Sequence, residues 1–393
     1  MRGPGGDLPP HPGPAGGPVY LDYNATTPVD PRVAEAMAPY LTDFFGNPSS
    51  GHPYGETPRR ALAAARTRVA GLIGAHADEV VLTASGSEAD LLALRGAVLA
   101  SGRPRPHVIT QATEHPAVLE TCRALERLHG ARVTVLPVDR DGLVDPSGLA
   151  AALAQDTVVV SVMAANNETG TLQPVAELAS LAHEHGALFH CDAAQAVGKI
   201  PLDVKALGVD LLTVVGHKVY APKGAAALYV RDGVELEPVV YGGGQERGLR
   251  AGTENVALAV ALGTAARIAE ADLADGAPAR TAALRDDLHR RLTDGLPGRV
   301  HLNGPENNRL PNTLNISIDG VLGHDVLAVA RRIAASTGSA CHSGTHTPSP
   351  VLAAMGVDPA RALGALRLSL GRWTTSADIE TAATALIQAA ASR

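Results

Sequence analysis

Apolar runs alternate with segments of helical periodicity along most of the chain. Strands are predicted at 79–83, 107–110, 132–137, 157–163, 187–195 and 211–215, and the last three are apolar runs of the kind found in buried parallel strands. Between them, apolar positions recur at helical spacing, most clearly at 58–73, 88–100 and 147–153. This order of strands and helices predicts an α/β fold with a largely parallel sheet.

The two ends of the chain have different patterns. Residues 1–18 are almost entirely Gly, Pro and polar residues without periodicity, so we expect a disordered tail outside the fold. Toward the C-terminus, a long helix is predicted at about 256–273, with a linker near 276–278. Residues 312–318 alternate between polar and apolar side chains, which predicts a half-buried antiparallel strand.

A lysine follows one of the predicted buried strands. The run at 211–215 continues into Gly216, His217 and Lys218, so this lysine lies at the C-terminal end of a strand, where open α/β sheets bind ligands. Lysine is rare in this arginine-rich chain, and the only four are Lys199, Lys205, Lys218 and Lys223. A lysine that is present despite this preference for arginine indicates that its amine is needed, because a guanidinium stays protonated and cannot readily form a Schiff base.

The preceding strand brings a carboxylate to the same region. Its apolar run ends in Asp192, followed by Gln195. If the two strands are adjacent, these side chains gather with His217 and Lys218 at one edge of the sheet. A carboxylate there can pair with a protonated pyridine nitrogen while the lysine holds an aldehyde, which is the arrangement that a pyridoxal phosphate site requires. Lys218 alone would be read as a solvated residue, but its neighbours favour the cofactor site.

Composition limits the other possibilities. With 393 residues, of which 45% are hydrophobic, the chain can bury a large core and form two domains. Its net charge of -7 gives no reason to expect nucleic acid or an anionic membrane as a partner, and no apolar run reaches transmembrane length. We therefore expect a cytoplasmic protein. The three cysteines, Cys122, Cys191 and Cys341, are widely spaced, which argues against a disulfide framework and against a metal site.

Seven segments resemble, in the same order, the signatures of cysteine desulfurases and selenocysteine lyases, which are fold-type I pyridoxal phosphate enzymes of the class V aminotransferase group. They read LDYNATTP (21–28), FGNPSS (45–50), TEH (113–115), NNETG (166–170), DAAQ (192–195), GHK (216–218) and GSAC (338–341). The resemblance extends from about Val19 to the C-terminus. It implies a large domain at 33–269 around a mostly parallel seven-stranded sheet, and a smaller α+β domain formed by 19–32 and 270–393.

The resemblance also implies a role for each residue of the site. Lys218 would hold pyridoxal phosphate, Asp192 would keep its pyridine nitrogen protonated, and His115 would stack on its ring and move protons to and from the substrate sulfur. The other implied cofactor contacts are Asn167, Gln195, His217, Gly86, Ser87 and, from the partner chain of a homodimer, Thr253. For the substrate, the resemblance implies Arg367 as a bidentate clamp on the carboxylate, with Asn24 at the entrance.

The implied reaction removes sulfur from L-cysteine. It gives L-alanine and a persulfide on Cys341, which passes to a sulfur-acceptor protein, as in iron–sulfur cluster assembly. Cys341 lies among small residues and glycines, where we expect an exposed, reactive thiol. Cys191 lies in an apolar run and is expected to be buried and inert.

Four positions depart from the usual pattern of cysteine desulfurases. Val215 stands where these enzymes usually have a phosphate-binding serine, and Ser87 replaces the usual threonine. Leu91 replaces a common asparagine, and Ala221 replaces a common glycine. The loss of one hydroxyl contact at Val215, about 0.5–1.5 kcal/mol, predicts weaker cofactor binding. The segment around Val215 is closer to selenocysteine lyases, so L-selenocysteine is an alternative substrate. An aminotransferase or decarboxylating lyase would not need Cys341, and a non-catalytic sulfur-carrier scaffold would not bind the cofactor.

Overall fold

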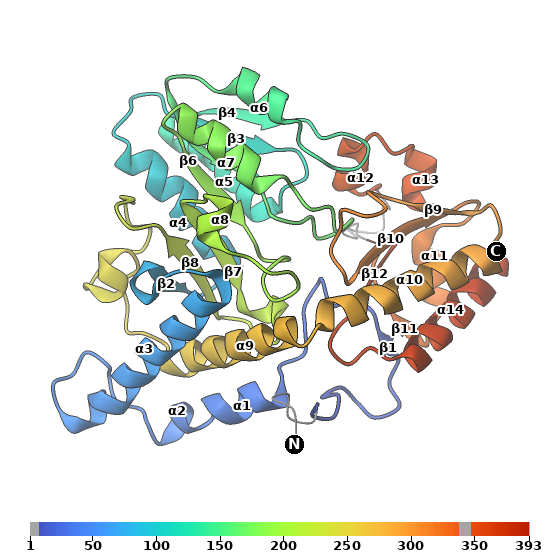
Figure 1. Cartoon of the computed structure of the whole chain (residues 1–393), viewed down its shortest axis with the longest axis horizontal. Helices are drawn as coiled ribbons and strands as arrows, with labels where there is room; N and C mark the ends of the chain where they lie inside the picture. Colours follow the sequence, from blue (N-terminus) through green and yellow to red (C-terminus); the bar gives the residue numbers. More distant parts are fainter. Residues whose placement is uncertain (1–7, 338–346, 393) are drawn as a thin grey trace.

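The computed structural model describes residues 8–337 and 347–392. Figure 1 shows a larger part built around a central sheet and a smaller part that contains the C-terminus. Within the described ranges, no helix combines the length and the apolar character needed to cross a membrane.

The larger part contains the predicted seven-stranded sheet. Its strands are β2 (Val80–Thr83), β3 (His107–Gln111), β4 (Arg132–Leu136), β5 (Thr157–Ser161), β6 (Leu188–Asp192), β7 (Leu211–Val215) and β8 (Ala226–Val230), in the order β2-β8-β7-β6-β5-β3-β4. Strand β8 is antiparallel to its neighbours β2 and β7, and the other pairs are parallel. Because β2 and β7 are both antiparallel to β8, they run in the same direction, and their carboxyl ends lie at one edge of the sheet.

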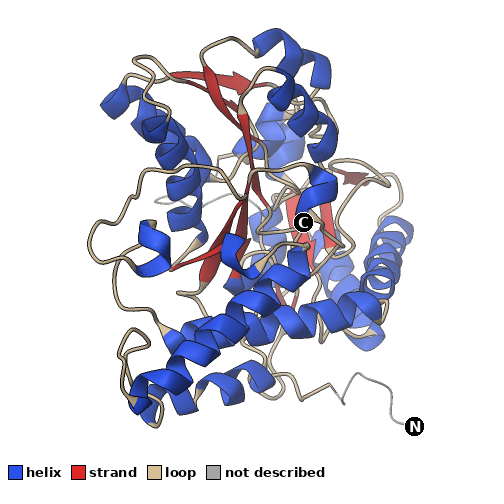
Figure 2. Cartoon of the chain, turned by 60° about the vertical axis from the view of Figure 1, so that its left-hand side comes forward, coloured by secondary structure: helices blue, strands red, loops and turns tan. Residues whose placement is uncertain are grey.

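Helices cover both faces of this sheet (Figure 2). They are α1 (Pro31–Met37), α2 (Pro39–Thr42), α3 (Pro53–Ile73), α4 (Gly86–Ala100), α5 (Pro116–His129), α6 (Pro146–Ala152), α7 (Val175–Glu184), α8 (Val204–Leu207) and α9 (Val256–Ala274). Three short 3-10 helices are η1 (Ala77–Glu79), η2 (Gly216–Lys218) and η3 (Gln245–Gly248). One apolar core joins the sheet to α4 and α5, and another joins it to α3, α6, α7 and α9. The predicted α/β class is confirmed.

The smaller part packs helices against a second sheet. This sheet contains three antiparallel strands, β9 (Val300–Leu302), β10 (Thr313–Ile318) and β12 (Ala365–Ser369), in the order β12-β10-β9. A separate two-stranded sheet pairs β1 (Val19–Tyr20) in parallel with β11 (Ile333–Ala334). Its helices are α10 (Ala277–Gly295), α11 (Gly323–Val329), α12 (Pro350–Ala354), α13 (Pro359–Leu363) and α14 (Ser376–Ala391). Leu21 belongs to the core of this part, so the N-terminal strand joins the C-terminal region. The domain limits at 32 and 270 stay a prediction.

Two expectations about the smaller part were wrong. Every residue of β10 is buried, not half of them, because its polar side chains find buried partners. The Asn303 Nδ2 group donates to Asn315 Oδ1 and to Ser317 Oγ, each at 2.9 Å. The expected linker near 276–278 is only a two-residue turn at 275–276, since α9 ends at Ala274 and α10 begins at Ala277.

The segment at 8–18 forms neither helix nor strand, yet it contacts the smaller part. The Trp373 Nε1 group donates to the Pro9 carbonyl at 2.7 Å, and the His11 ring meets the Trp373 ring edge-on at 5.5 Å. This part of the expected tail therefore lies against the fold instead of outside it. Residues 1–7 are outside the described ranges.

Candidate active site

The carboxyl ends of β6 and β7 bring the predicted lysine and carboxylate to one edge of the sheet. The two strands are parallel neighbours, with Asp192 opposite Thr213 in the register, as the sequence predicted. Lys218 follows β7 on the short turn η2. A Cβ atom on Gly216, the first residue of that turn, would lie 2.6 Å from the Ala225 carbonyl oxygen, which precedes β8, so only glycine lets the chain turn this closely.

The Lys218 amine lies against the N-terminal loop. Its Nζ donates to the carbonyl oxygens of Asn24 at 2.7 Å and Ala25 at 2.8 Å. Burial and the nearby Arg367 lower the pKa of this amine from 10.5 to about 8, and Asp192 and Asp22 act in the opposite direction. Near neutral pH, a larger fraction of this amine is therefore neutral and nucleophilic than in an exposed lysine.

Asp192 is one of three buried carboxyl groups near this edge. Burial raises its pKa, while a hydrogen bond from the Ala194 amide at 2.9 Å, His115 and Lys218 lower it. Burial raises the pKa of Asp90 and of Glu114 well above the ordinary value, and the Asp192 charge raises both further. Asp192 differs from these two neighbours in that His115 and Lys218 lie close enough to lower its pKa against the effect of burial.

His115 caps the first turn of α5. Its Nδ1 accepts a hydrogen bond from the Ala117 amide at 3.1 Å, so the proton of the neutral ring is on Nε2. The surrounding protein desolvates the ring and lowers its pKa, as does Lys218, while Asp192 raises it. Even so, the residue is exposed to solvent. The structure thus brings His115, Asp192 and Lys218 within electrostatic reach of one another.

Gln195 and His217 hold the N-terminal loop in place beside Lys218. The Gln195 Nε2 group donates at 2.9 Å to the Asn24 carbonyl, which is also bonded by Lys218. His217 Nδ1 lies 3.1 Å from Thr26 Oγ1. Both predicted residues therefore lie next to the lysine.

A residue without a predicted role, Lys199, contacts Gln195. Its Nζ lies 2.7 Å from Gln195 Oε1. The rarity of lysine, which drew attention to Lys218, applied equally to Lys199 and was the signal that could have found it.

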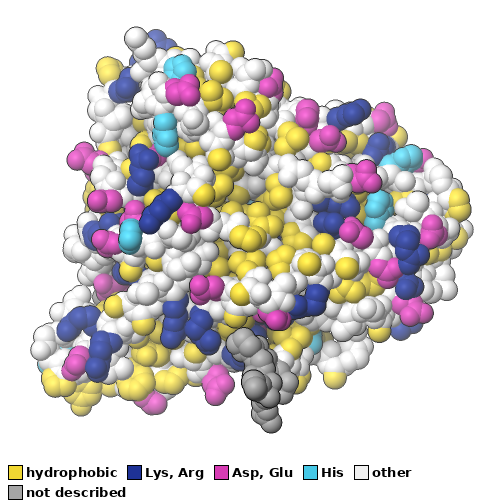
Figure 3. Space-filling model, viewed as in Figure 1, with side chains coloured by type: hydrophobic (Ala, Val, Ile, Leu, Met, Phe, Trp, Pro, Cys, Tyr) yellow, Lys and Arg dark blue, Asp and Glu magenta, His cyan; other side chains and the backbone are white. Residues whose placement is uncertain are grey.

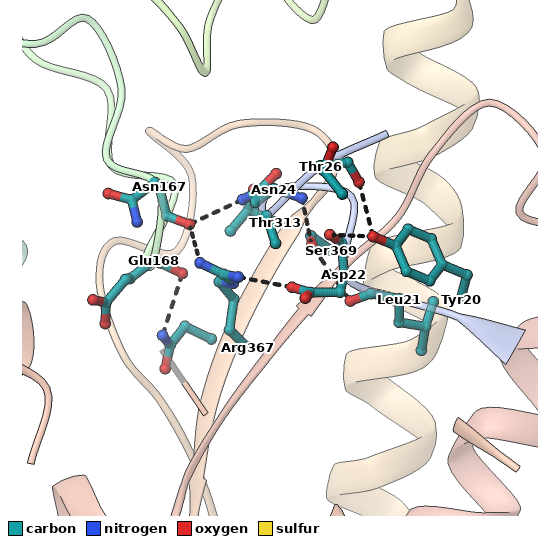
Figure 4. A network of polar contacts seen from close by, with 12 residues as sticks. Tyr20, Leu21, Asp22, Asn24, Thr26, Asn167, Glu168, Thr313, Arg367 and Ser369 are labelled. Atoms are coloured by element: carbon teal, nitrogen blue, oxygen red, sulfur yellow. Dashed lines mark hydrogen bonds and ion pairs between the residues drawn. The ribbon is translucent and has the colours of Figure 1, made fainter. Parts of the chain in front are cut away.

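Arg367 reaches the site from β12 and pairs with Asp22, another residue that the sequence analysis missed (Figure 4). Its Nη2 lies 2.7 Å from Asp22 Oδ1, and its Nη1 lies 3.4 Å from the Asn167 carbonyl, which also accepts from Asn24 Nδ2 at 3.1 Å. The buried Nε of Arg367 has no hydrogen-bond partner among the described residues. One donor of the guanidinium fork thus stays free to bind an anion such as a carboxylate.

The N-terminus of α4 lies at the same edge of the sheet. Thr83 at the end of β2 and Val215 at the end of β7 both flank Ala226 of β8. A Cβ atom on Gly86, the first residue of α4, would lie 2.6 Å from Val215 Cγ2, so the helix start touches the strand that leads to Lys218. The first amides of a helix have no partner within it and attract anions, as does the helix dipole. Phosphate binding by Gly86 and the exposed Ser87 stays a prediction.

The other predicted site residues have fewer described contacts. Thr253 is exposed in the loop before α9. Cys341 lies outside the described residues, so its role stays a prediction. Cys191 is fully buried, and burial and nearby carboxyl groups raise its thiol pKa well above 9.0, which makes it inert as expected.

These groups fit pyridoxal phosphate. The lysine of lowered pKa suits its aldehyde, the buried Asp192 suits its ring nitrogen, and the start of α4 suits its phosphate. The geometry alone does not name a substrate.

Comparisons with known proteins agree with this fit. The chain is 46% identical over 367 residues to a cysteine desulfurase IscS of Dictyoglomus turgidum, with 92% of this chain and 91% of that protein covered. It is 48% identical over 364 residues to a cysteine desulfurase of Trichormus azollae, with 92% of this chain and 90% of that protein covered. A solved NifS-like protein superposes with a TM-score of 0.87 at 35% identity, covering 94% of this chain and 98% of that one. A structure described as SspA in complex with cysteine superposes with a TM-score of 0.80 at 35% identity, covering 91% of this chain and 99% of that one. The family model described as aminotransferase class-V matches residues 19–381, and the chain therefore belongs to this family of pyridoxal phosphate enzymes.

Proposed function

We propose that the protein is a pyridoxal phosphate-dependent cysteine desulfurase, which converts L-cysteine to L-alanine and passes the sulfur to an acceptor. The observation that carries the proposal is the placement of Lys218 and Asp192 at the ends of adjacent parallel strands, with Arg367 within electrostatic reach. The relatives above bear the name cysteine desulfurase, and the SspA structure was solved with cysteine.

The cofactor, when bound at Lys218, supplies an electron sink for the substrate α-carbon. Asp192, buried at the end of β6 beside Lys218, is the carboxyl group placed to keep a proton on its ring nitrogen. The Lys218 amine, with a pKa of about 8, can take a proton from the α-carbon and return it near neutral pH.

Arg367 orients the substrate by binding its carboxylate. The Asp22 carboxylate already bonds one end of the guanidinium at 2.7 Å, so the substrate binds to the remaining donors, including Nε. Asn24, whose carbonyl and amide groups link Lys218 to Asn167, lies between the amine and this clamp.

Sulfur transfer requires an acceptor thiol, and we assign it to Cys341. The thiolate attacks the substrate sulfur, an S–S bond forms as the C–S bond breaks, and the electron pair of the C–S bond stays with the carbon that becomes the alanine methyl group. His115, with its proton on Nε2, is the group that exchanges protons with the sulfur. The persulfide then passes to the thiol of an acceptor protein.

The proposal includes a homodimer. Large apolar side chains are exposed around α2 and the start of α3, including Leu41 (64%), Phe45 (71%) and Tyr54 (66%), and hydrophobic side chains are visible at this corner in the lower left of Figure 3. Such a patch is typical of a protein interface. Light scattering should give twice the mass of the chain, and a monomer over a wide concentration range would contradict this part of the proposal.

The test is alanine release from L-cysteine and from L-selenocysteine, measured for the wild type, Lys218→Ala and Cys341→Ala. We expect the wild type to release alanine from L-cysteine and both variants to release none. We expect only Lys218→Ala to lose the visible absorbance of the bound cofactor. Lys205→Ala, at an exposed lysine of α8, is the matched control and should retain both. Alanine from L-selenocysteine alone would indicate a selenocysteine lyase, and full activity of Cys341→Ala would indicate another lyase or aminotransferase. A wild type that binds the cofactor but releases no alanine would refute the proposal, as would a chain that binds no cofactor.

A further inference from the structure

A second, partly buried amine lies next to the Lys218 site. Lys199 Nζ lies 2.7 Å from Gln195 Oε1, and the Nε2 of the same carboxamide donates at 2.9 Å to the Asn24 carbonyl. That carbonyl also accepts from Lys218 Nζ at 2.7 Å. Three consecutive hydrogen bonds therefore connect the two lysines through one carboxamide and one carbonyl.

A tight turn after β6 places Lys199 back over Gln195. The Lys199 amide donates to the Ala196 carbonyl at 3.0 Å, and Gly198 has a φ of 71°. A Cβ atom on Gly198 would lie 3.0 Å from Ala269 Cβ on α9, so glycine suits both the backbone angle and the close packing. The turn is thus fixed by the large core and not by the N-terminal loop.

The orientation of the Gln195 carboxamide follows from its two partners. The Asn24 carbonyl can only accept a hydrogen bond, so the amide nitrogen of Gln195 must face it. The amide oxygen then faces Lys199, which supplies a donor. Without that donor, the buried oxygen would lose its partner, and the carboxamide would be free to rotate away from the carbonyl.

Lys199 can supply this donor without adding a charge. Burial lowers the pKa of its amine well below 10.5, and the positive charges of Lys218 and Arg367 lower it further. His217 also lies close enough to interact with this amine, since the charge of Lys199 lowers the pKa of His217. A neutral amine still donates a hydrogen bond, whereas arginine would keep its charge and would repel Lys218 and Arg367.

We propose that Lys199 is a positioning residue, which fixes the Gln195 carboxamide beside Lys218 by donating a hydrogen bond to its oxygen. The inference rests on the proposed function, for which the family resemblance implies Gln195 as a cofactor contact. In this arrangement, Lys199 acts only through Gln195 and touches neither substrate nor cofactor.

The first test uses the protein without cofactor. In a crystal structure of cofactor-free Lys199→Met, we expect the Gln195 side chain to leave hydrogen-bonding distance of the Asn24 carbonyl. In Lys199→Gln, which keeps a neutral donor, we expect it to stay. Lys205→Met, at an exposed lysine, is the control for removing an amine and should leave Gln195 in place. An unchanged Gln195 in Lys199→Met would overturn the proposal.

The second test is the dissociation constant of pyridoxal phosphate, measured by titrating each cofactor-free protein. The loss of one buried hydrogen bond predicts about three- to tenfold weaker binding in Lys199→Met, with recovery in Lys199→Gln and no change in Lys205→Met. Equal binding by wild type and Lys199→Met would overturn the inference while leaving the proposed function intact. If the wild type bound no cofactor, the proposed function would fail, and the crystal structures would still decide whether Lys199 holds Gln195.

Discussion

Glu168 provides a test of the electrostatics around the site, because its carboxyl group is buried close to Arg367. Its Oε2 accepts a hydrogen bond from Ser349 Oγ at 2.5 Å. Burial raises its pKa from 4.5 to about 7, and the Ser349 hydrogen bond and Arg367 act in the opposite direction. The folded protein therefore holds a proton on Glu168 at a pH at which the unfolded chain has released it.

The sign and size of the effect on stability follow from this difference. Between pH 4.5 and about 7, the folded state binds more protons than the unfolded state, so the free energy of unfolding falls as the pH rises. A shift of about 2.5 units, at 1.36 kcal/mol per unit, corresponds to roughly 3 kcal/mol lost above pH 7. The replacement Glu168→Gln keeps the size and an acceptor for Ser349 but does not titrate.

We therefore expect Glu168→Gln to gain stability relative to the wild type by roughly 3 kcal/mol between about pH 4 and pH 8. The assay is the free energy of unfolding in urea across this pH range. Any cost of the extra amide group is the same at every pH and cancels in the comparison. Glu177→Gln, at an exposed glutamate of α7, is the matched control and should show no such pH-dependent gain. A difference between Glu168→Gln and wild type that does not vary with pH would refute the reasoning.

Three further substitutions test the packing around the site. Val215→Ser adds a hydroxyl group beside the start of α4, so the dissociation constant of pyridoxal phosphate should fall about two- to tenfold, and an unchanged value would count against a phosphate site there. Gly371→Ala would place a Cβ atom 2.1 Å from the buried Tyr23 ring, which should lower the free energy of unfolding by about 1–3 kcal/mol in urea titrations; wild-type stability would contradict this close contact. Arg372→Met removes a partner of Asp30, whose side chain is 0% exposed and lies 2.6 Å away. Because Arg32 still pairs with Asp30 at 2.8 Å, we expect a loss of about 1.5–3 kcal/mol by the same assay, and a loss below about 1 kcal/mol would show that the pair contributes little.

The sequence by itself indicated the strands of the large sheet except β8, and the main pair of the site. Continuous apolar runs predict burial on both faces, and residues that directly follow such runs must lie at the carboxyl edge of a parallel sheet. The pattern of residues placed Asp192 and Lys218 together on the condition that their strands are adjacent, and the structure shows that β6 and β7 are neighbours. The ordered motifs correctly indicated the family.

Only the tertiary structure decided which partners these groups have. Asp22 pairs with Arg367 across 345 positions of sequence, and the polar face of β10 is buried because Asn303 lies beside it. The lowered pKa of Lys199 likewise depends on desolvation by the surrounding protein and on charges brought close by the fold. Local patterns report whether a residue is buried, because burial on a strand or helix has a fixed period. They do not report which distant group lies opposite, and that group sets the hydrogen bonds and the charge state.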